Sequence, residues 1–219
     1  MVNLGDIVPD FNCDSTHGSL NFHKYIEGSW AILFSHPSDF TPVCTTELGR
    51  VGSLAEEFAR RGVKLIALSC DSADSHRAWV GDIAATQGHG FPYPIIADES
   101  REIATLWGML QKGFTNQQGI PLTCRALYII GPDKKLKLSV LYPASTGRNF
   151  PEILRCVDSL QLTAQFPVAT PADWQVQGDC MVIPTLSDAE ATQKFPKGFR
   201  SIATPSGRKY LRMTPNPKL

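Results

Sequence analysis

The sequence lacks the features that mark membrane-spanning, secreted and nucleic-acid-binding proteins. It holds no run of about 18 apolar residues, the length a membrane helix needs. Its first residues, Met1–Asp6, have neither the basic segment nor the long apolar segment of a secretory signal. Lys and Arg number 21, as do Asp and Glu, so no basic excess indicates a nucleic-acid partner. We therefore expect a cytoplasmic protein with no transmembrane segment and no nucleic-acid partner.

Low-complexity composition and cysteine-based metal motifs are absent too. The 17 glycines and 16 prolines among 219 residues fall below the combined share of roughly 25–30% that marks low-complexity chains. No two of the six cysteines form a C-x-x-C, and none is paired locally with a histidine. This pattern argues against a zinc site and against a thioredoxin-type dithiol. The open question is which cysteine, if any, is reactive.

Short apolar runs alternate with helical patterns, which indicates an α/β protein. The predicted strands are Trp30–Ser35, Val63–Cys70, Tyr93–Ala97, Ala126–Ile130 and Leu136–Tyr142. The predicted helices are Pro42–Arg61, Asp74–Thr86, Ser100–Trp107 and Pro151–Gln165. Near Phe166 the periodicity weakens and prolines accumulate. We therefore expect one domain over residues 1–165 and a small unit over residues 166–219, packed on the first domain or on a partner chain.

The most informative segment is His36–Leu48, H-P-S-D-F-T-P-V-C-T-T-E-L, which leaves a predicted strand and enters a predicted helix. Thr41 is a favourable N-cap residue and Pro42 is favoured at the first helical position, so Cys44 falls in the first turn. Unpaired N–H groups and the positive end of the helix dipole stabilise a thiolate there. Most free cysteines are buried small apolar residues. Helix placement alone leaves both alternatives open for Cys44.

The spacing Pro37-x-x-x-Thr41-x-x-Cys44 matches the active-site signature of the peroxiredoxins. The fuller segment resembles the 1-Cys, peroxiredoxin-6-type subfamily, with Thr45 where typical 2-Cys members carry proline. The similarity continues in Tyr93–Asp98, Gly131–Ser139, Tyr142–Phe150, Phe195–Gly198 and Lys209–Arg212. The resemblance implies an α/β, thioredoxin-like three-layer fold with a small C-terminal extension. It also implies a thiol peroxidase that needs no metal or organic cofactor.

The resemblance assigns roles to individual residues. Cys44 corresponds to the peroxidatic cysteine, Thr41 to its hydroxyl partner and Pro37 to the residue that shields the pocket. Arg125 corresponds to the active-site arginine, although without the resemblance a surface salt bridge would be the favoured interpretation. The expected substrates are hydrogen peroxide and organic hydroperoxides. The thiolate would become a sulfenic acid and return through an external thiol such as glutathione or thioredoxin. The expected assembly is a homodimer or a higher oligomer.

Three further residues match supporting positions of the family. Glu47 and Arg148 match its supporting carboxylate and second arginine, and His36 matches a histidine placed near the sulfur. Each has an ordinary alternative. Glu47 fits a charge at a helix start, Arg148 a loop arginine, and His36 a histidine packed beside proline.

The C-terminal resolving cysteine of 2-Cys relatives lies in a Val-Cys-Pro segment, which this sequence lacks. Cys180 is the remaining C-terminal candidate, and we expect it to be buried and inert. Cys70, Cys124 and Cys156 are expected to be packing residues.

Two other functions remain as alternatives. One is a redox-sensing or holdase-type interaction protein. The other is an additional phospholipase A2-like activity at Ser29, for which His23 and Asp133 match the proposed partners. A nucleophile elbow needs small flanking residues, and the glycines around Ser29 are displaced or replaced. We therefore expect Ser29 only to begin a strand.

Overall fold

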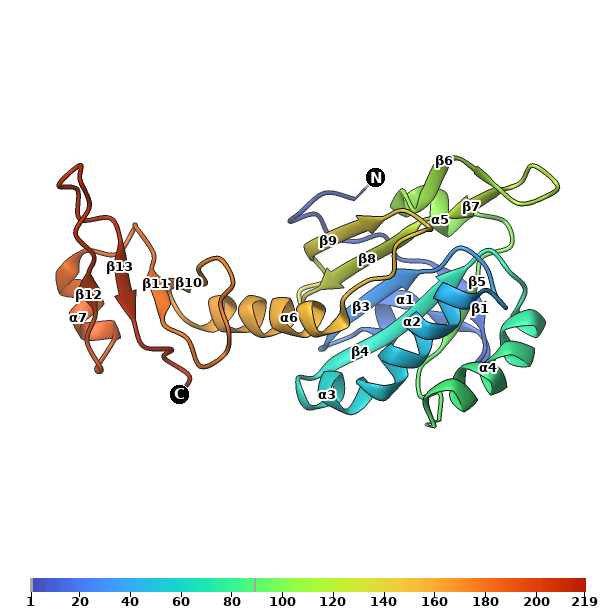
Figure 1. The fold of residues 1–219 in the computed structure, drawn as a ribbon, viewed down its shortest axis with the longest axis horizontal. Coiled ribbons are helices and arrows are strands. Elements are labelled where there is room, and N and C mark those ends of the chain that lie inside the picture. The colour runs from blue at the N-terminus through green and yellow to red at the C-terminus, as the bar shows by residue number, and fades with distance from the viewer. Residues whose placement is uncertain (1, 89) are drawn as a thin grey trace. The chain divides into compact units, whose positions relative to one another are not determined.

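The structure is a computed structural model that describes residues 2–88 and 90–219, and it divides into two compact units, Met1–Phe150 and Pro151–Leu219 (Figure 1). The expected boundary lay after residue 165. The structure instead assigns most of helix α6 (Phe150–Gln165) to the second unit. The reason is packing, because Leu162 of this helix belongs to the same buried cluster as Val168 and Trp174.

A seven-stranded sheet with the order β2-β1-β5-β4-β3-β8-β9 forms the centre of the first unit. The adjacent strands β3, β4 and β5 are parallel, whereas the pairings on either side of them are antiparallel. The strands are β1 (Asn12–Ser15), β2 (Leu20–Asn21), β3 (Trp30–Ser35), β4 (Val63–Ser69), β5 (Ile95–Ala97), β8 (Arg125–Ile130) and β9 (Leu136–Tyr142).

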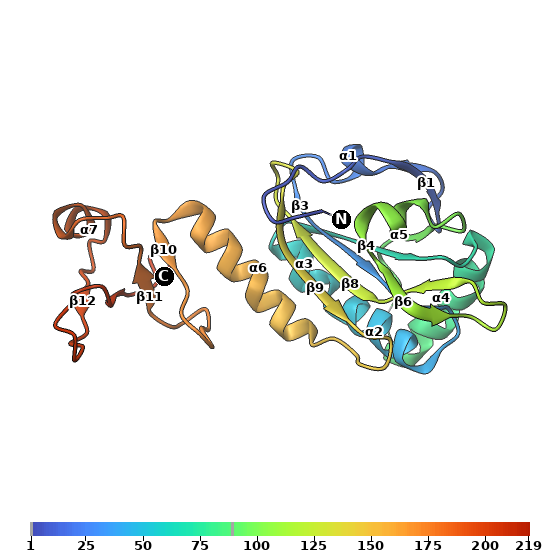
Figure 2. The same cartoon turned by 90° about the horizontal axis from the view of Figure 1, so that it is seen from above.

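Helices cover both faces of this sheet (Figure 2). One face carries α2 (Pro42–Ser53), α3 (Ala55–Arg60) and α4 (Ala73–Gln87), and the other carries α1 (Phe22–Tyr25) and α5 (Glu102–Trp107). The sheet is apolar on both faces because every residue of β8 is buried, as are the last five residues of β3. This arrangement confirms the predicted layered α/β class.

Two helix boundaries differ from the predictions. The helix predicted over Pro42–Arg61 breaks at Leu54, where φ −101° and ψ 4° leave the helical region, so it becomes α2 and α3. The helix predicted from Ser100 begins at Glu102 as α5. The Asp98 carboxylate accepts two backbone N–H groups of its first turn, at 3.2 and 2.7 Å, and Ser100 Oγ accepts a third at 3.4 Å. Side chains that precede the helix thus satisfy its first N–H groups.

The first unit also contains a two-stranded hairpin, β6 (Leu110–Thr115) with β7 (Pro121–Thr123), that was not predicted. Its sequence is polar and carries Gly113 at φ +75°, so it shows no strand-like apolar alternation. Among the strands described, these two pair only with each other, in antiparallel orientation, and the register shifts between Leu110 and Thr115.

The second unit combines two helices with a four-stranded antiparallel sheet of order β10-β11-β13-β12. Its elements after α6 are β10 (Val168–Ala169), β11 (Cys180–Val182), α7 (Asp188–Lys194), β12 (Arg200–Ser201) and β13 (Arg212–Thr214). It has its own apolar core, to which Trp174, Cys180 and Phe195 belong. Among the helices described in either unit, none has the length and apolar character needed to cross a bilayer.

Candidate active site

Cys44 lies in the first turn of α2, directly after the loop that follows β3. Thr41 takes the N-cap position and Pro42 begins the helix, as predicted. The Thr41 hydroxyl does not cap the helix, because its Oγ1 donates to the Ser38 carbonyl at 2.9 Å. The first-turn N–H groups are therefore not occupied by this hydroxyl. The Cys44 side chain is completely buried.

Arg125, the first residue of β8, reaches the Cys44 sulfur. Its Nη1 donates to Sγ at 3.5 Å and to Glu47 Oε2 at 2.7 Å. Its Nε and Nη2 both donate to the Ala144 carbonyl, at 2.9 and 2.7 Å. The rigid guanidinium fork is thus fixed by a carboxylate on one side and a carbonyl on the other, with the sulfur beside it.

Glu47 lies one turn after Cys44 in the same helix and binds both arginines. It accepts from Arg148 Nε and Nη2, each at 2.9 Å, and from the Arg148 backbone N–H at 2.6 Å. Burial acts to raise the pKa of Glu47, but the charge and hydrogen bonds of Arg148, with the charge of Arg125, bring it below its usual value. Glu47 is therefore ionised and holds both guanidiniums in place.

The charges of this cluster are unequal. The side chains of Arg125, Arg148 and Glu47 are only 1–3% exposed, so water screens them weakly. Two guanidiniums and one carboxylate leave one positive charge in excess. Arg125 Nη1, which carries part of this charge, lies 3.5 Å from the Cys44 sulfur. The excess positive charge therefore lies next to the buried Cys44 sulfur.

Comparisons with known proteins agree with this chemistry. The AhpC/TSA family model matches residues 4–139, and the model of the C-terminal domain of 1-Cys peroxiredoxin matches residues 159–198. Peroxiredoxin-6 of Rattus norvegicus is 58% identical over 218 residues, which cover 98% of this chain and 97% of that protein. The chain belongs to the 1-Cys peroxiredoxins.

Solved peroxiredoxin structures extend the similarity to the fold. A cysteine-to-serine mutant of the peroxiredoxin 6 of Arenicola marina matches with a TM-score of 0.97 and 57% identity, covering 100% of both chains. A yeast mitochondrial 1-Cys peroxiredoxin matches with a TM-score of 0.90 and 41% identity, covering 98% of this chain and 100% of that one. The expected thioredoxin-like fold and thiol peroxidase class are confirmed.

In this peroxiredoxin, His36 and Pro37 begin the loop between β3 and α2, and both are buried. His36 Nε2 donates to Asp39 Oδ1 at 2.8 Å, and His76 Nδ1 donates to Asp39 Oδ2 at 2.7 Å. Burial acts to raise the pKa of Asp39, but the hydrogen bonds and charges of the two histidines hold it well below its usual value. The side-chain hydrogen bond of His36 therefore leads to Asp39 and not to the sulfur.

His36, Asp39 and His76 are also the described residues whose ligand atoms come close enough together, within 4.8 Å, to surround a metal ion. Their donor atoms already face one another at hydrogen-bond distance, and a proton between each nitrogen and its carboxylate oxygen accounts for both contacts. The geometry fits a hydrogen-bonded chain better than a ligand set, and the absence of a metal remains a prediction.

The remaining cysteines lie in surroundings that disfavour the thiolate. Burial raises the pKa of Cys70 to about 12 and that of Cys156 to about 11, and it also raises the pKa of Cys124 and Cys180. Cys180 is fully buried in the core of the second unit. All six cysteines are free. Arg155 Nη2 donates to Cys156 Sγ at 3.9 Å, but that thiol itself donates to the Glu152 carboxylate at 3.4 Å, and burial and Glu152 together keep its pKa raised.

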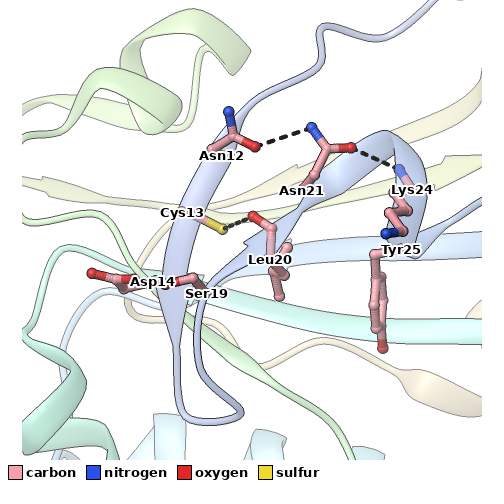
Figure 3. Close-up of a pocket in the computed structure, with 8 residues that line it drawn as sticks. All are labelled: Asn12, Cys13, Asp14, Ser19, Leu20, Asn21, Lys24 and Tyr25. Carbon is pink, nitrogen blue, oxygen red and sulfur yellow. Dashed lines mark hydrogen bonds between the residues drawn. The ribbon is translucent and has the colours of Figure 1, made fainter.

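Cys13 lines a hollow of about 770 Å³ beside the β1–β2 hairpin and α1 (Figure 3). Its Sγ donates to the Leu20 carbonyl at 3.9 Å. Burial, followed by the charges of Asp14 and Asp98, raises the pKa of Cys13 to about 12. This pocket therefore holds a protonated thiol at neutral pH and lacks the cationic partner that distinguishes Cys44.

The structure does not bring the residues of the phospholipase alternative together by hydrogen bonds. Ser29 Oγ donates to the Glu27 carbonyl at 3.4 Å, and His23 Nε2 bonds the Val8 carbonyl at 2.8 Å. Asp133 accepts from Lys137 Nζ at 2.7 Å. Ser29 directly precedes β3, as expected for a residue that begins a strand.

Two parts of the site were missed in the sequence. One is the Ala144 carbonyl that fixes Arg125, a backbone group for which no residue type gives a signal. The other is the pair Asp39 and His76, 37 residues apart in the chain. The only sequence signal for this pair was the position of Asp39, three residues after His36 in the segment His36–Leu48.

Proposed function

We propose that Cys44 is the peroxidatic cysteine and that the protein reduces hydrogen peroxide and organic hydroperoxides. The excess positive charge of the buried Glu47, Arg125 and Arg148 cluster, 3.5 Å from Sγ, is the observation that supports this most directly. Burial raises the pKa of every other cysteine in the described chain, including Cys156, whose neighbour Arg155 does not offset it.

The thiolate attacks the terminal oxygen of the peroxide. An S–O bond forms, the O–O bond breaks, and the electron pair leaves on hydroxide or alkoxide, which takes a proton from water. Arg125 donates to the oxygens on which charge develops, and Glu47 with Arg148 keeps its fork in place. Thr41 gives its own proton to Ser38, so its oxygen is a hydrogen-bond acceptor for the peroxide hydroxyl. Pro37 shields the pocket from the side of the loop.

The test is peroxide consumption by Cys44→Ser beside Cys180→Ser. We expect Cys44→Ser to lose turnover with hydrogen peroxide and with an organic hydroperoxide while its circular dichroism stays unchanged. Cys180→Ser, which removes a thiol held protonated by burial, should keep the wild-type rate. Turnover by Cys44→Ser at near wild-type rate would assign the nucleophile to another cysteine.

We propose that an external thiol, glutathione or thioredoxin, returns the Cys44 sulfenic acid to the thiol. The yeast 1-Cys peroxiredoxin with the matching fold is described as resolved via glutathione/thioredoxin systems. All six cysteines are free and Cys180 belongs to the core of the second unit, which supports a role for an outside thiol. Intact mass after one equivalent of peroxide should show one added oxygen, or one added glutathione when that thiol is present.

Excess peroxide without thiol should drive Cys44 to the sulfinic level. A stoichiometric Cys44–Cys180 disulfide would contradict this proposal.

We further propose a homodimer in the cytoplasm. Strand β9 is an edge strand of the sheet, and Leu141 on it is 54% exposed, which is suitable for pairing with a second copy. Six free cysteines fit a reducing compartment. Sedimentation of Leu141→Lys against the wild-type protein tests the assembly. If Leu141→Lys remains a dimer, the interface lies elsewhere on the protein. If the wild-type protein is a monomer, the proposed dimer is wrong.

A further inference from the structure

The carbonyl that holds Arg125 belongs to a turn on the surface of the first unit. Ala144 lies in the turn Pro143–Thr146 after β9, in which the Thr146 N–H donates to the Pro143 carbonyl at 3.1 Å. The other three residues of the turn are exposed, whereas the Arg125 side chain is only 3% exposed. A buried guanidinium therefore depends on a backbone group from an exposed segment.

The Ala144 carbonyl fixes the guanidinium along one edge. Nε and Nη2 of Arg125 converge on it at 2.9 and 2.7 Å, which leaves Nη1 for Glu47 at 2.7 Å and for the Cys44 sulfur at 3.5 Å. A guanidinium is planar, so two points of attachment set its plane and the direction of its N–H groups. If the carbonyl moved, the bond to Glu47 alone would let the plane turn, and Nη1 would lose its direction toward the sulfur.

Gln111 of β6 binds the other side of Ala144. Its Oε1 accepts the Ala144 N–H at 3.3 Å, from a position 33 residues earlier in the chain. An N–H group can only donate, so the oxygen of the amide has to face it. Gln111 is half-buried, whereas Lys112 and Gly113 after it are exposed. The polar hairpin β6–β7 thus gives one side chain to the residue that fixes Arg125.

The base of this hairpin is itself fixed. Thr123 ends β7 and is fully buried, and its Oγ1 donates to the His36 carbonyl at 2.6 Å. Leu110, the residue before Gln111, pairs with Thr123 across the hairpin. The Gln111 side chain therefore extends from a fixed backbone, and its amide can determine where Ala144 lies.

We infer that Gln111 is a positioning residue for peroxide reduction that keeps the Arg125 fork directed at the Cys44 sulfur. It acts through Ala144, and the inference rests on the proposed role of Cys44. When the Gln111 amide is lost, Arg125 keeps its charge and its bond to Glu47. Its donor is then no longer preorganised where charge develops on the peroxide oxygens. The Gln111 amide bonds Ala144 and not the sulfur, so its effect on the rate has to pass through Arg125.

Amide hydrogen exchange of ¹⁵N-labelled protein tests the contact directly. The Ala144 N–H should exchange about fivefold faster in Gln111→Leu, which removes the acceptor. It should exchange at the wild-type rate in Gln111→Glu, which keeps a side-chain oxygen at this position. The Thr146 N–H, which is bonded within the turn, is the internal reference and should not change. Equal exchange of the Ala144 N–H in the wild type and in Gln111→Leu would overturn the inference.

The functional test is the rate constant of Cys44 oxidation by hydrogen peroxide, measured by stopped flow. Gln111→Leu should lower it about fivefold, the scale of one neutral hydrogen bond, and Gln111→Glu should stay within about twofold of the wild type. The matched control is Gln118→Leu, the same substitution at an exposed position of the same hairpin, which should also stay within about twofold. Circular dichroism checks that each variant is folded.

A double-mutant cycle decides whether the effect passes through the arginine. In an Arg125→Ala background, Gln111→Leu should cause no further slowing, because the fork that Ala144 holds is gone. A further loss of about fivefold there would overturn the positioning role. So would a wild-type rate in Gln111→Leu, or equal slowing in Gln111→Glu or Gln118→Leu. Each of these results leaves the assignment of Cys44 intact if Cys44→Ser has lost turnover, whereas turnover retained by Cys44→Ser would refute that assignment and the inference with it.

Discussion

Two buried carboxylates, Asp39 and Glu47, lie on opposite sides of Cys44 in the sequence and have different partners. Glu47 binds two guanidiniums, whereas Asp39 binds two imidazoles. Burial acts to raise the pKa of each carboxyl, and in each case the cationic and hydrogen-bonding partners bring it below its usual value. A guanidinium cannot release its proton, but an imidazole can. The cluster of Glu47, Arg125 and Arg148 therefore carries a fixed positive charge. The imidazoles bound to Asp39 can instead be either charged or neutral.

The largest expected effect comes from removing each carboxylate in turn. Glu47→Ala leaves Arg125 and Arg148 buried without their anion, and we expect the free energy of unfolding to fall by about 3–5 kcal/mol. Asp39→Ala should cost less, because an imidazole, unlike a guanidinium, has an uncharged form that can be buried without an anion. Urea unfolding measures both. The control is Glu57→Ala, whose 40% exposed side chain pairs with Arg60 and Arg61 and should matter by at most about 1 kcal/mol. Equal losses of unfolding free energy in Asp39→Ala and Glu47→Ala would show that imidazole and guanidinium partners do not differ in this respect.

The next effect concerns the rate. Arg125→Ala should slow the oxidation of Cys44 by hydrogen peroxide about 10²–10³-fold, the usual cost of losing one preorganised donor. Arg125→Lys should recover part of the rate, since it restores a charge but not the fork that binds Glu47 and Ala144 together. Stopped-flow fluorescence measures the rate, with the exposed Arg50→Ala on the same helix as control. An unchanged oxidation rate in Arg125→Ala would contradict the proposed role of Arg125 as a donor at the site.

The pH dependence of stability should separate the two clusters. Burial lowers the pKa of His36 in the folded protein, so below about pH 6.5 the unfolded chain binds a proton that the folded chain resists, and stability falls. The lowered pKa of Glu47 gives stability that is complete above about pH 4.3 and is lost as pH falls through the folded value. Denaturant midpoints from pH 8 to pH 3 should show both losses. His36→Gln should remove the first loss, and Glu47→Gln should reduce the second, to which the lowered pKa of Asp39 also contributes. A single acid transition unaffected by His36→Gln would show that His36 does not titrate separately.

The smallest expected effect is that of Ser75→Ala. The hydroxyl is one of three donors to Asp39, and its loss should cost about 0.5–1.5 kcal/mol of stability. Thermal unfolding measures this, and a cost as large as that of Asp39→Ala would mean that Ser75 and not the histidines holds the carboxylate.

Much of the central sheet was predictable because its strands are short apolar runs bounded by turns. The predictions for Trp30–Ser35 and Leu136–Tyr142 agree with β3 and β9 to the residue. Predictions failed where neighbours outside the local sequence decide the structure. The polar β6–β7 hairpin lacks the apolar pattern of a strand. Most of α6 belongs to the second unit, and its Leu162 packs with residues that follow the helix.

The sequence by itself determined the position of Cys44, because strand pattern, N-cap residue and Pro42 are local signals that put a cysteine at a helix start. It also identified Glu47, Arg125 and Arg148 through resemblance to a family. Only the tertiary structure decided that these three form one buried cluster with an excess positive charge, and that Asp39 receives His76 from a distant helix. The physical reason is that burial and pairing are properties of groups brought together from different elements. The charge and proton positions of a site therefore follow from packing, which no single stretch of sequence contains.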